Sequence, residues 1–445
     1  MALAIAASNY NHQSSIIHQK MKQEKIKAPA FTAYQKFIIA LLATLQFTII
    51  LDFIIISPLG DILMKSLDMS TTNFGITVSA YAFSAGASGL LAAGFADRFD
   101  RKKLLVFFYT GFIIGTICCA FATDYWTLLS ARIVTGLFGG VIGSVSLAIV
   151  TDLFELNQRG RVMGFIQMAF ATSQILGIPI GLYFANKWGW HSAFLMIAAV
   201  GVIILLSVII KMNPVNKHLG LQADKNAFLH LWHTLSNKKY QIGFTAIAFL
   251  SVGGFMLQPF GSAFLINNIG IPQADLPTVY FFTGLSVLVI MPIVGKLSDK
   301  VSKVKLFAAG SFISIVTIIV YTNLHVIPLW EVILINMVMF MGVMSRMIPA
   351  TTLNTGIPEM KDRGAYMAIT SSLQQIAGGI AAVCAGFIVV QQTKTSPLEH
   401  YDTLGYVIAG VTLVSIYLVS RVGKLVKSKN TQIDPQAVAE AVIND

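Results

Sequence analysis

The strongest constraint on the fold of this chain is a series of twelve long apolar segments. They cover residues 39–57, 74–95, 104–122, 126–150, 162–185, 192–211, 242–266, 278–296, 306–322, 328–348, 366–390 and 404–422. A helix that crosses a bilayer needs about 20 predominantly apolar residues, and in lipid every backbone polar group must be satisfied internally. The pattern therefore predicts an all-α membrane protein with twelve transmembrane helices.

The composition agrees with a chain whose surroundings are mostly lipid. Of its 445 residues, 55% are hydrophobic and 11% are charged, whereas soluble proteins carry about 25% charged residues. The net charge of +11 comes from short basic runs between the apolar segments. Nucleic-acid binding would need these charges on one face or stripe, so we exclude a soluble domain and expect no nucleic-acid partner.

The basic residues predict the orientation, because Lys and Arg concentrate in cytoplasmic loops. With both termini inside, 26 of the 31 Lys and Arg residues fall in the tails and inner loops, and 3 fall in outer loops, at Lys65, Lys187 and Lys394. A shift by one helix would invert this ratio. We therefore expect both termini in the cytoplasm.

The two halves of the chain resemble each other. The loop after the second apolar segment reads GFADRFDRKK and the loop after the eighth reads GKLSDKVSKVK, while NQRGRVMG before the fifth segment corresponds to KDRGAYMA before the eleventh. Internal duplication is typical of repeat-built transporters, whose substrate site lies between the repeats near the bilayer midplane. The predicted division is a cytosolic tail at 1–36, a six-helix bundle at 37–211, a cytoplasmic loop with an interfacial helix at 212–240, a second six-helix bundle at 241–423 and a cytosolic tail at 424–445.

Metal and enzyme chemistry find little support in the sequence. His230 and His233 lie in the central loop without Cys or carboxylate partners at ligand spacing, so a solvated helix face is the better interpretation than a metal pair. No Gly-rich loop followed by Lys is present to bind ATP, and no nucleophile has a paired base. We expect no metal, no cofactor and no enzymatic activity.

Short motifs stand at fixed places relative to the apolar segments. The loop after the second segment carries Asp97, Arg98 and Arg101, and its second copy carries Asp299 and Lys300; the fourth segment carries Arg132, Gly136 and Gly140, and the fifth carries Gly177, Pro179 and Gly181. Over about residues 36 to 422 the chain resembles the major facilitator superfamily, with the fifth-segment spacing similar to its bacterial drug and sugar efflux branch. Ala93 and Asp100 depart from the loop motif, which has Gly at both places.

The resemblance implies a two-bundle fold, a bacterial inner-membrane location, a small-molecule substrate, a monomer and a proton gradient as the energy source. It also implies a cytoplasmic gate, in which Asp97 approaches the start of the eleventh helix and Arg101 reaches Asp152. The predicted gate residues are Asp97, Arg98, Arg101, Asp152, Asp299 and Lys300. The Gly and Pro residues of the fourth and fifth segments suit a hinge, and close helix packing is the alternative.

Three ionisable residues, Asp52, Arg132 and Arg346, lie well within the apolar segments, where charge is costly. Asp52 and Arg132 are expected at similar depth and could pair. The proton affinity of a buried carboxylate depends on its distance from a cation, so a change in this distance as the halves rock would couple protons to transport. A static structural ion pair is the alternative.

Arg346 could attract an anionic substrate group, hold a carboxylate, reach a helix end or extend toward the cytoplasmic interface. Uncharged polar residues at helical depth are candidates for the cavity wall, with interhelical hydrogen bonding as the alternative. They are Gln46, Gln167, Gln174, Gln258, Asn336, Gln374 and Gln375. The preferred hypothesis is a proton-coupled exporter; a proton symporter or facilitator for uptake, and a non-transporting membrane receptor, are the alternatives.

Overall fold

The computed structural model describes residues 31–95, 98–216, 219, 227–359 and 362–433, and this part of the chain is almost entirely helical. Twelve helical segments are long and apolar enough to cross a membrane. In the described residues, the one β-type pairing is an isolated bridge between Val390 and Glu399. The predicted all-α protein with twelve transmembrane helices is therefore confirmed.

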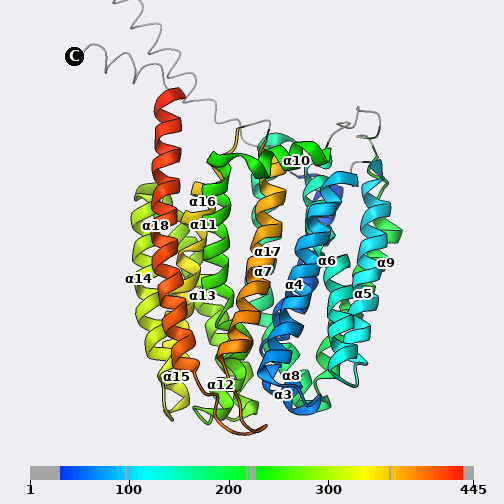
Figure 1. Cartoon of the computed structure of the whole chain (residues 1–445). Coiled ribbons are helices and arrows are strands. Elements are labelled where there is room, and N and C mark those ends of the chain that lie inside the picture. Colours follow the sequence, from blue (N-terminus) through cyan, green and yellow to red (C-terminus); the bar gives the residue numbers. More distant parts are fainter. Residues whose placement is uncertain (1–30, 96–97, 217–218, 220–226, 360–361, 434–445) are drawn as a thin grey trace, which may run out of the picture.

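The first half contains six crossings (Figure 1). They are α2 (Ala33–Ile55), α4 (Thr71–Phe95), α5 (Arg101–Ala120), α6 (Tyr125–Leu153), the composite α7 (Leu156–Thr172), η2 (Ser173–Gly177) and α8 (Ile178–Trp188), and α9 (His191–Lys211); a short helix, α3 (Gly60–Ser66), follows α2. The connection to the second half contains α10 (Ala227–Ser236).

The second half repeats this arrangement. Its crossings are α11 (Lys238–Phe255) continued by η4 (Gln258–Phe260) and α12 (Gly261–Asn267), α13 (Leu276–Lys300) preceded by η5 (Gln273–Asp275), α14 (Lys303–Thr322), α15 (Leu329–Ser345) continued by α16 (Met347–Thr355), α17 (Arg363–Ile388) and α18 (Tyr401–Ile433). An even number of crossings brings the chain back to the side on which it started.

Two helix ends differ from the predicted boundaries. The helix α2 begins at Ala33, inside the segment 1–36 that we expected to be a tail, because Thr32 and Gln35 form a capping box at its start. At the other end, α18 continues to Ile433 through the predicted boundary at 423. Lys424 and Lys427 end the apolar pattern there, but Lys is a good helix former, so the helix goes on.

Three crossings are interrupted. The fifth contains a π-helical turn over Ser173–Gly177, directly before Pro179, and π-turns are a recognised cause of bends in helices. The seventh breaks between Phe255 and Gly261, around Pro259. The tenth breaks at Arg346, between α15 and α16. Interrupted helices are typical of the segments that line transporter sites.

The two halves meet along two helix pairs. The helix α4 packs against α17, and α8 with η2 packs against α13. At one end of the molecule lies α10, which contacts α17, α11 and α4; α3, α8 and α12 lie at the opposite end (Figure 1). We call these the α10 end and the α3 end. An apolar core at the α3 end includes residues of both halves, such as Leu59 and Phe260.

Candidate functional site

Asp52 and Arg132 form an ion pair inside the N-terminal half. Arg132 Nη1 lies 2.8 Å from Asp52 Oδ2 and 3.2 Å from the backbone oxygen of the same residue. Both side chains have an exposed fraction of 0%. The structure thus brings together the two residues that the sequence placed at similar depth, one from α2 and one from α6.

Two further side chains, Thr116 and Tyr81, contact this pair. The hydroxyl of Thr116 on α5 donates to Asp52 Oδ1 at 3.1 Å, so both carboxylate oxygens are bound. The ring of Tyr81 on α4 lies against the guanidinium of Arg132, with its centroid 4.5 Å from Cζ, a cation–π contact. The sequence did not single out Thr116 or Tyr81, because a hydroxyl or an aromatic ring in an apolar segment is too common to signal a site.

A small cavity lies between the two halves, next to the ion pair. We call it the interface cavity, and its lining comes from both halves and contains no charged side chain. The lining residues are Phe53, Ser57, Val78, Ala82, Phe255, Gln258, Pro259, Gly378 and Ala382. Aromatic contacts join it to the ion pair: the ring of Phe53 lies 5.2 Å from that of Tyr81 and 5.8 Å from that of Phe255, between centroids.

The glycines of the fourth and fifth crossings permit close packing around the pair. A Cβ at Gly136 or Gly140 would collide with the backbone of α4. A Cβ at Gly177 would lie 2.6 Å from Leu51 Cδ1, and one at Gly181 would lie 2.9 Å from Ile55 Cδ1. Small residues therefore hold α6 against α4 and the fifth crossing against α2, and Pro179 follows the π-helical turn.

The expected contact of the loop motif is present. Arg101 Nε lies 3.3 Å from Asp152 Oδ2, with side-chain exposures of 5% and 20%, and the backbone N–H of Arg101 donates to Val215 O. Arg98 and Lys300 are exposed. Asp97 and the side chain of Asp299 lie outside the described residues.

The residues predicted to line a cavity take different positions. Gln258 lines the interface cavity, Gln174 is buried where the fifth crossing meets Gly284 of α13, and Asn336 Nδ2 donates to Thr283 Oγ1 at 3.1 Å. Gln167 is exposed, and Gln46, Gln374 and Gln375 are half-buried.

Arg346 is buried inside the C-terminal half, with an exposed fraction of 1%. Its Nη1 donates to Thr412 Oγ1 of α18 at 3.2 Å. The alternative in which this side chain extends toward the cytoplasmic interface is therefore wrong.

The predicted interfacial helix is α10, and it contacts the C-terminal half through a side chain. His230 Nε2 of α10 lies 2.9 Å from Asp362 Oδ1, the residue before α17.

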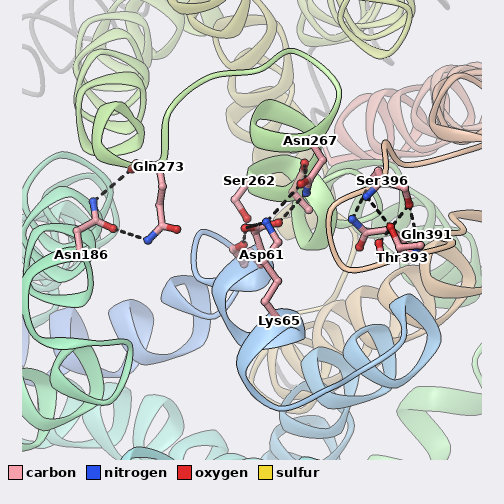
Figure 2. Close-up of polar contacts among 11 residues, drawn as sticks. Asp61, Lys65, Asn186, Ser262, Asn267, Gln273, Gln391, Thr393 and Ser396 are labelled. Carbon is pink, nitrogen blue, oxygen red and sulfur yellow. Dashed lines mark hydrogen bonds and ion pairs between the residues drawn. The ribbon is translucent and has the colours of Figure 1, made fainter.

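Polar contacts between the halves gather at the α3 end (Figure 2). Asp61 accepts from Asn267 Nδ2 at 2.6 Å and from Lys65 Nζ at 2.7 Å. Asn186 and Gln273 exchange two hydrogen bonds, at 2.9 and 3.2 Å. The sequence does not single out these residues, because they fall just outside the apolar segments, where outer loops are predicted.

Comparison with known proteins decides the family. Residues 42–382 match the family model described as Major Facilitator Superfamily. The chain belongs to this superfamily. Together with its twelve candidate spans, this makes it a multi-pass membrane protein of that superfamily, as the loop and helix motifs indicated, although the chain spans only 25% of the length of one curated relative that it matches.

Relatives with similar sequences are named for different functions. The chain is 35% identical over 145 residues to the vacuolar membrane amino acid uptake transporter fnx2 of Schizosaccharomyces pombe, a match of 32% of this chain and 25% of that protein. It is 28% identical over 155 residues to a probable sugar efflux transporter of Helicobacter acinonychis, 35% of this chain and 39% of that one. An uncharacterized transporter of this type from Bacillus subtilis, YbcL, is 23% identical over 85% of this chain and 95% of its own.

Solved structures share the fold at low identity. A bacterial homolog to the human lysosomal transporter Spinster, in an inward-facing and unoccupied conformation, has a TM-score of 0.65 and 14% identity over 89% of this chain and 97% of its own. A mutant of the nucleoside transporter NupG has a TM-score of 0.71 and 13% identity over 87% and 99%. These likenesses confirm the fold of two six-helix bundles.

Proposed function

We propose that this superfamily member is a proton-coupled transporter that exports a small molecule across a bacterial inner membrane by alternating access. The observation that carries the proposal is the fully buried pair of Asp52 and Arg132. A carboxylate at membrane depth, held by one cation and one hydroxyl, can take up or release a proton when either partner moves. A potential of 100 mV supplies about 2.3 kcal/mol per charge, so no resident cofactor is required.

The aromatic contacts suggest how substrate and proton are coupled. An occupant of the interface cavity touches Phe53, which follows Asp52 in the chain and packs on Tyr81. The ring of Tyr81 in turn lies on Arg132. We infer that substrate displaces these rings, shifts the guanidinium relative to the carboxylate and thereby changes the proton occupancy of Asp52.

Alternating access requires each end of the carrier to open in turn. The hydrogen bonds of Asp61 with Asn267, and of Asn186 with Gln273, hold the two halves together at the α3 end. The distribution of Lys and Arg supports the proposal that this end is extracellular and that both termini are cytoplasmic. Release of substrate to the outside would break these bonds, while the pair of Arg101 and Asp152 would stabilise the gate at the α10 end.

The direction of transport is part of the proposal. The relatives named as sugar efflux transporters favour export. The partial match to a protein named as an amino acid uptake transporter supports the second candidate, a proton symporter or facilitator for uptake. Inverted membrane vesicles separate the two, because an exporter accumulates its substrate there when the interior is acidic.

The experiment screens inverted vesicles with radiolabelled sugars, a radiolabelled amino-acid mixture and the lipophilic cation ethidium. The compound that accumulates in an acidic interior is then tested with Asp52→Asn. We expect this variant to lose accumulation and to keep downhill equilibration, because the substrate path remains while the proton site is lost. Undiminished accumulation by Asp52→Asn would show that the pair is only structural.

A matched control is Asp124→Asn. Asp124 is an exposed aspartate that caps the start of α6 through the backbone N–H groups of Trp126 and Thr127, and Asn is an equally good helix cap. This variant should transport like the parent. If Asp52→Asn does not fold, Asp52→Glu keeps the charge, and we then expect a displaced pH dependence of transport.

A further inference from the structure

Arg346 lies in the core of the C-terminal half without a carboxylate partner in the described chain. Its side chain is 1% exposed, and Nε and Nη2 have no protein acceptor among the described residues. Among the described residues, the one hydrogen-bond partner of the guanidinium is the neutral hydroxyl of Thr412. Buried charges in proteins are normally paired, and in a membrane-spanning segment an unpaired cation is more costly still.

Two serine hydroxyls on the neighbouring helix α14 also lack a hydrogen-bond partner within the part of the chain that the structure describes. Most buried hydroxyls in the described spans donate to a carbonyl three or four residues earlier, as Ser345 does to Gly342 and Ser415 does to Val411. Ser311 and Ser314 are fully buried and make no such bond.

The helical positions of these serines place both on the side of α14 that faces the tenth crossing and α18, and we call this region between the three elements the seam. Gly310 of α14 faces Ser345 and the stem of Arg346, whereas Thr322 of α14 faces Gly405 of α18. At about 100° per residue, Gly310 and Thr322 bound an arc of about 120°. Ser311 and Ser314 fall inside this arc, so they lie between the tenth crossing and α18.

The heights of these residues along α14 and α18 also place the two serines in the seam. Gly405 meets Thr322 and Gly423 meets Val304, which sets Thr412 of α18 level with the turn of α14 that contains Ser314. Arg346 starts level with Gly310 and reaches Thr412. Its guanidinium therefore passes Ser311 and Ser314.

We propose that this seam binds a small monovalent inorganic anion of the chloride class, held by Arg346 with Ser311, Ser314 and Thr412. All of these groups can donate hydrogen bonds and none carries negative charge, so the site favours an anion over a cation. The helix α14 packs mainly on α15, α16 and α18 of its own half, away from the cavity between the halves. Because the four donors are fully buried there, the site favours a small ligand. The anion neutralises Arg346 and stabilises the C-terminal bundle.

The test is thermal unfolding of the full-length protein in detergent, with sodium gluconate replaced stepwise by sodium chloride at constant ionic strength. A ligand that binds only the folded state raises Tm in a saturable way. We expect such a rise with chloride, bromide and nitrate and none with sulfate, which is larger and doubly charged. Identical Tm values in chloride and gluconate would refute the site.

Variants locate the effect. Arg346→Met should abolish the chloride response. The double variant Ser311→Ala/Ser314→Ala should weaken the apparent affinity about tenfold or more through the loss of charge-assisted hydrogen bonds, and it keeps the test decisive if Arg346→Met does not fold. Arg421→Met is the matched control, because Arg421 is an exposed arginine of α18 and should keep the full response. A chloride response that survives in the Arg346 or serine variants belongs elsewhere and overturns the proposal.

Discussion

Asp52 and Arg132 are paired within a single half of the protein, with Oδ2 and Nη1 2.8 Å apart and neither side chain exposed. A rigid rocking of one half against the other leaves the distance between these two atoms unchanged. Rocking alone therefore does not change the distance between Asp52 and Arg132, and proton coupling also requires a contact that links this pair to the other half. The ring of Tyr81 on Arg132 and the ring of Phe53 on Phe255 connect the pair to the other half.

The first prediction concerns the stability of this pair. Asp52→Asn and Arg132→Gln each leave one buried group uncompensated, which costs about 3–5 kcal/mol in buried pairs of this kind. The double variant removes both charges and should be more stable than the sum of the single losses indicates. Thermal unfolding in detergent measures all four proteins, and strictly additive losses would mean that the two side chains do not interact.

The fold was predictable where hydropathy alone determines it. Twelve apolar segments and the Lys and Arg pattern led to twelve helices, because lipid admits little else. The helix ends were less predictable, since the capping box at Thr32 and the continuation of α18 past Lys424 depend on local hydrogen bonding and helix propensity. The break at Arg346 has a local cause that hydropathy does not show, because Pro349 has no N–H to donate to the carbonyl of Ser345, where α15 ends.

The candidate site was predictable where a charge stands in an apolar segment, as at Asp52 and Arg132. Thr116 and Tyr81 were not, because their role depends on which helices become neighbours. Asp61 lies just beyond an apolar segment, yet it is 2% exposed. Its burial comes from contacts with Asn267, about 200 residues later, and a pattern within one segment carries no such information.

The second prediction concerns helix packing, and the chain supplies its own control. A Cβ at Gly140 would collide with Ala85 of α4, whereas nothing lies within 4 Å of a Cβ at Gly143, one turn further along α6. Gly140→Ala should lower the stability by about 1–3 kcal/mol through overpacking. Gly143→Ala should be neutral or slightly stabilising, because Ala is the better helix former. Equal Tm values for the two variants would contradict the packing role.

The third prediction concerns the gate at the α10 end. Arg101→Ala and Asp152→Ala should not be additive, with a coupling energy of about 0.5–3 kcal/mol in a double-mutant cycle, as is usual for residues in contact. The measurement is chemical or thermal unfolding, with transport of the screened substrate as a second readout. Lys103→Ala removes an exposed basic residue of the same turn and should change neither. A zero coupling energy would show that the contact contributes nothing to the stability of the N-terminal half, to which both residues belong.

The fourth prediction concerns the opposite end. Asn186 and Gln273 come from different halves and exchange two hydrogen bonds, as Figure 2 shows. Cysteines at both positions, joined by a short bifunctional methanethiosulfonate that forms a reducible disulfide with each thiol, should hold the α3 end closed. Because alternating access requires this end to open, we expect the cross-linked protein to lose transport and a reducing agent to restore it.

The background for this experiment replaces the native Cys118, Cys119 and Cys384, two of which are exposed and would react. Each single cysteine variant, treated with the same reagent, controls for modification without cross-linking and should transport normally. The single variants Asn267→Ala and Asp61→Ala offer the converse test: each removes the hydrogen bond between Asn267 and Asp61, which should favour the form open at the α3 end and raise the labelling rate of a cysteine at position 57. Full transport in the cross-linked protein would mean that the two halves do not separate at this end during the cycle.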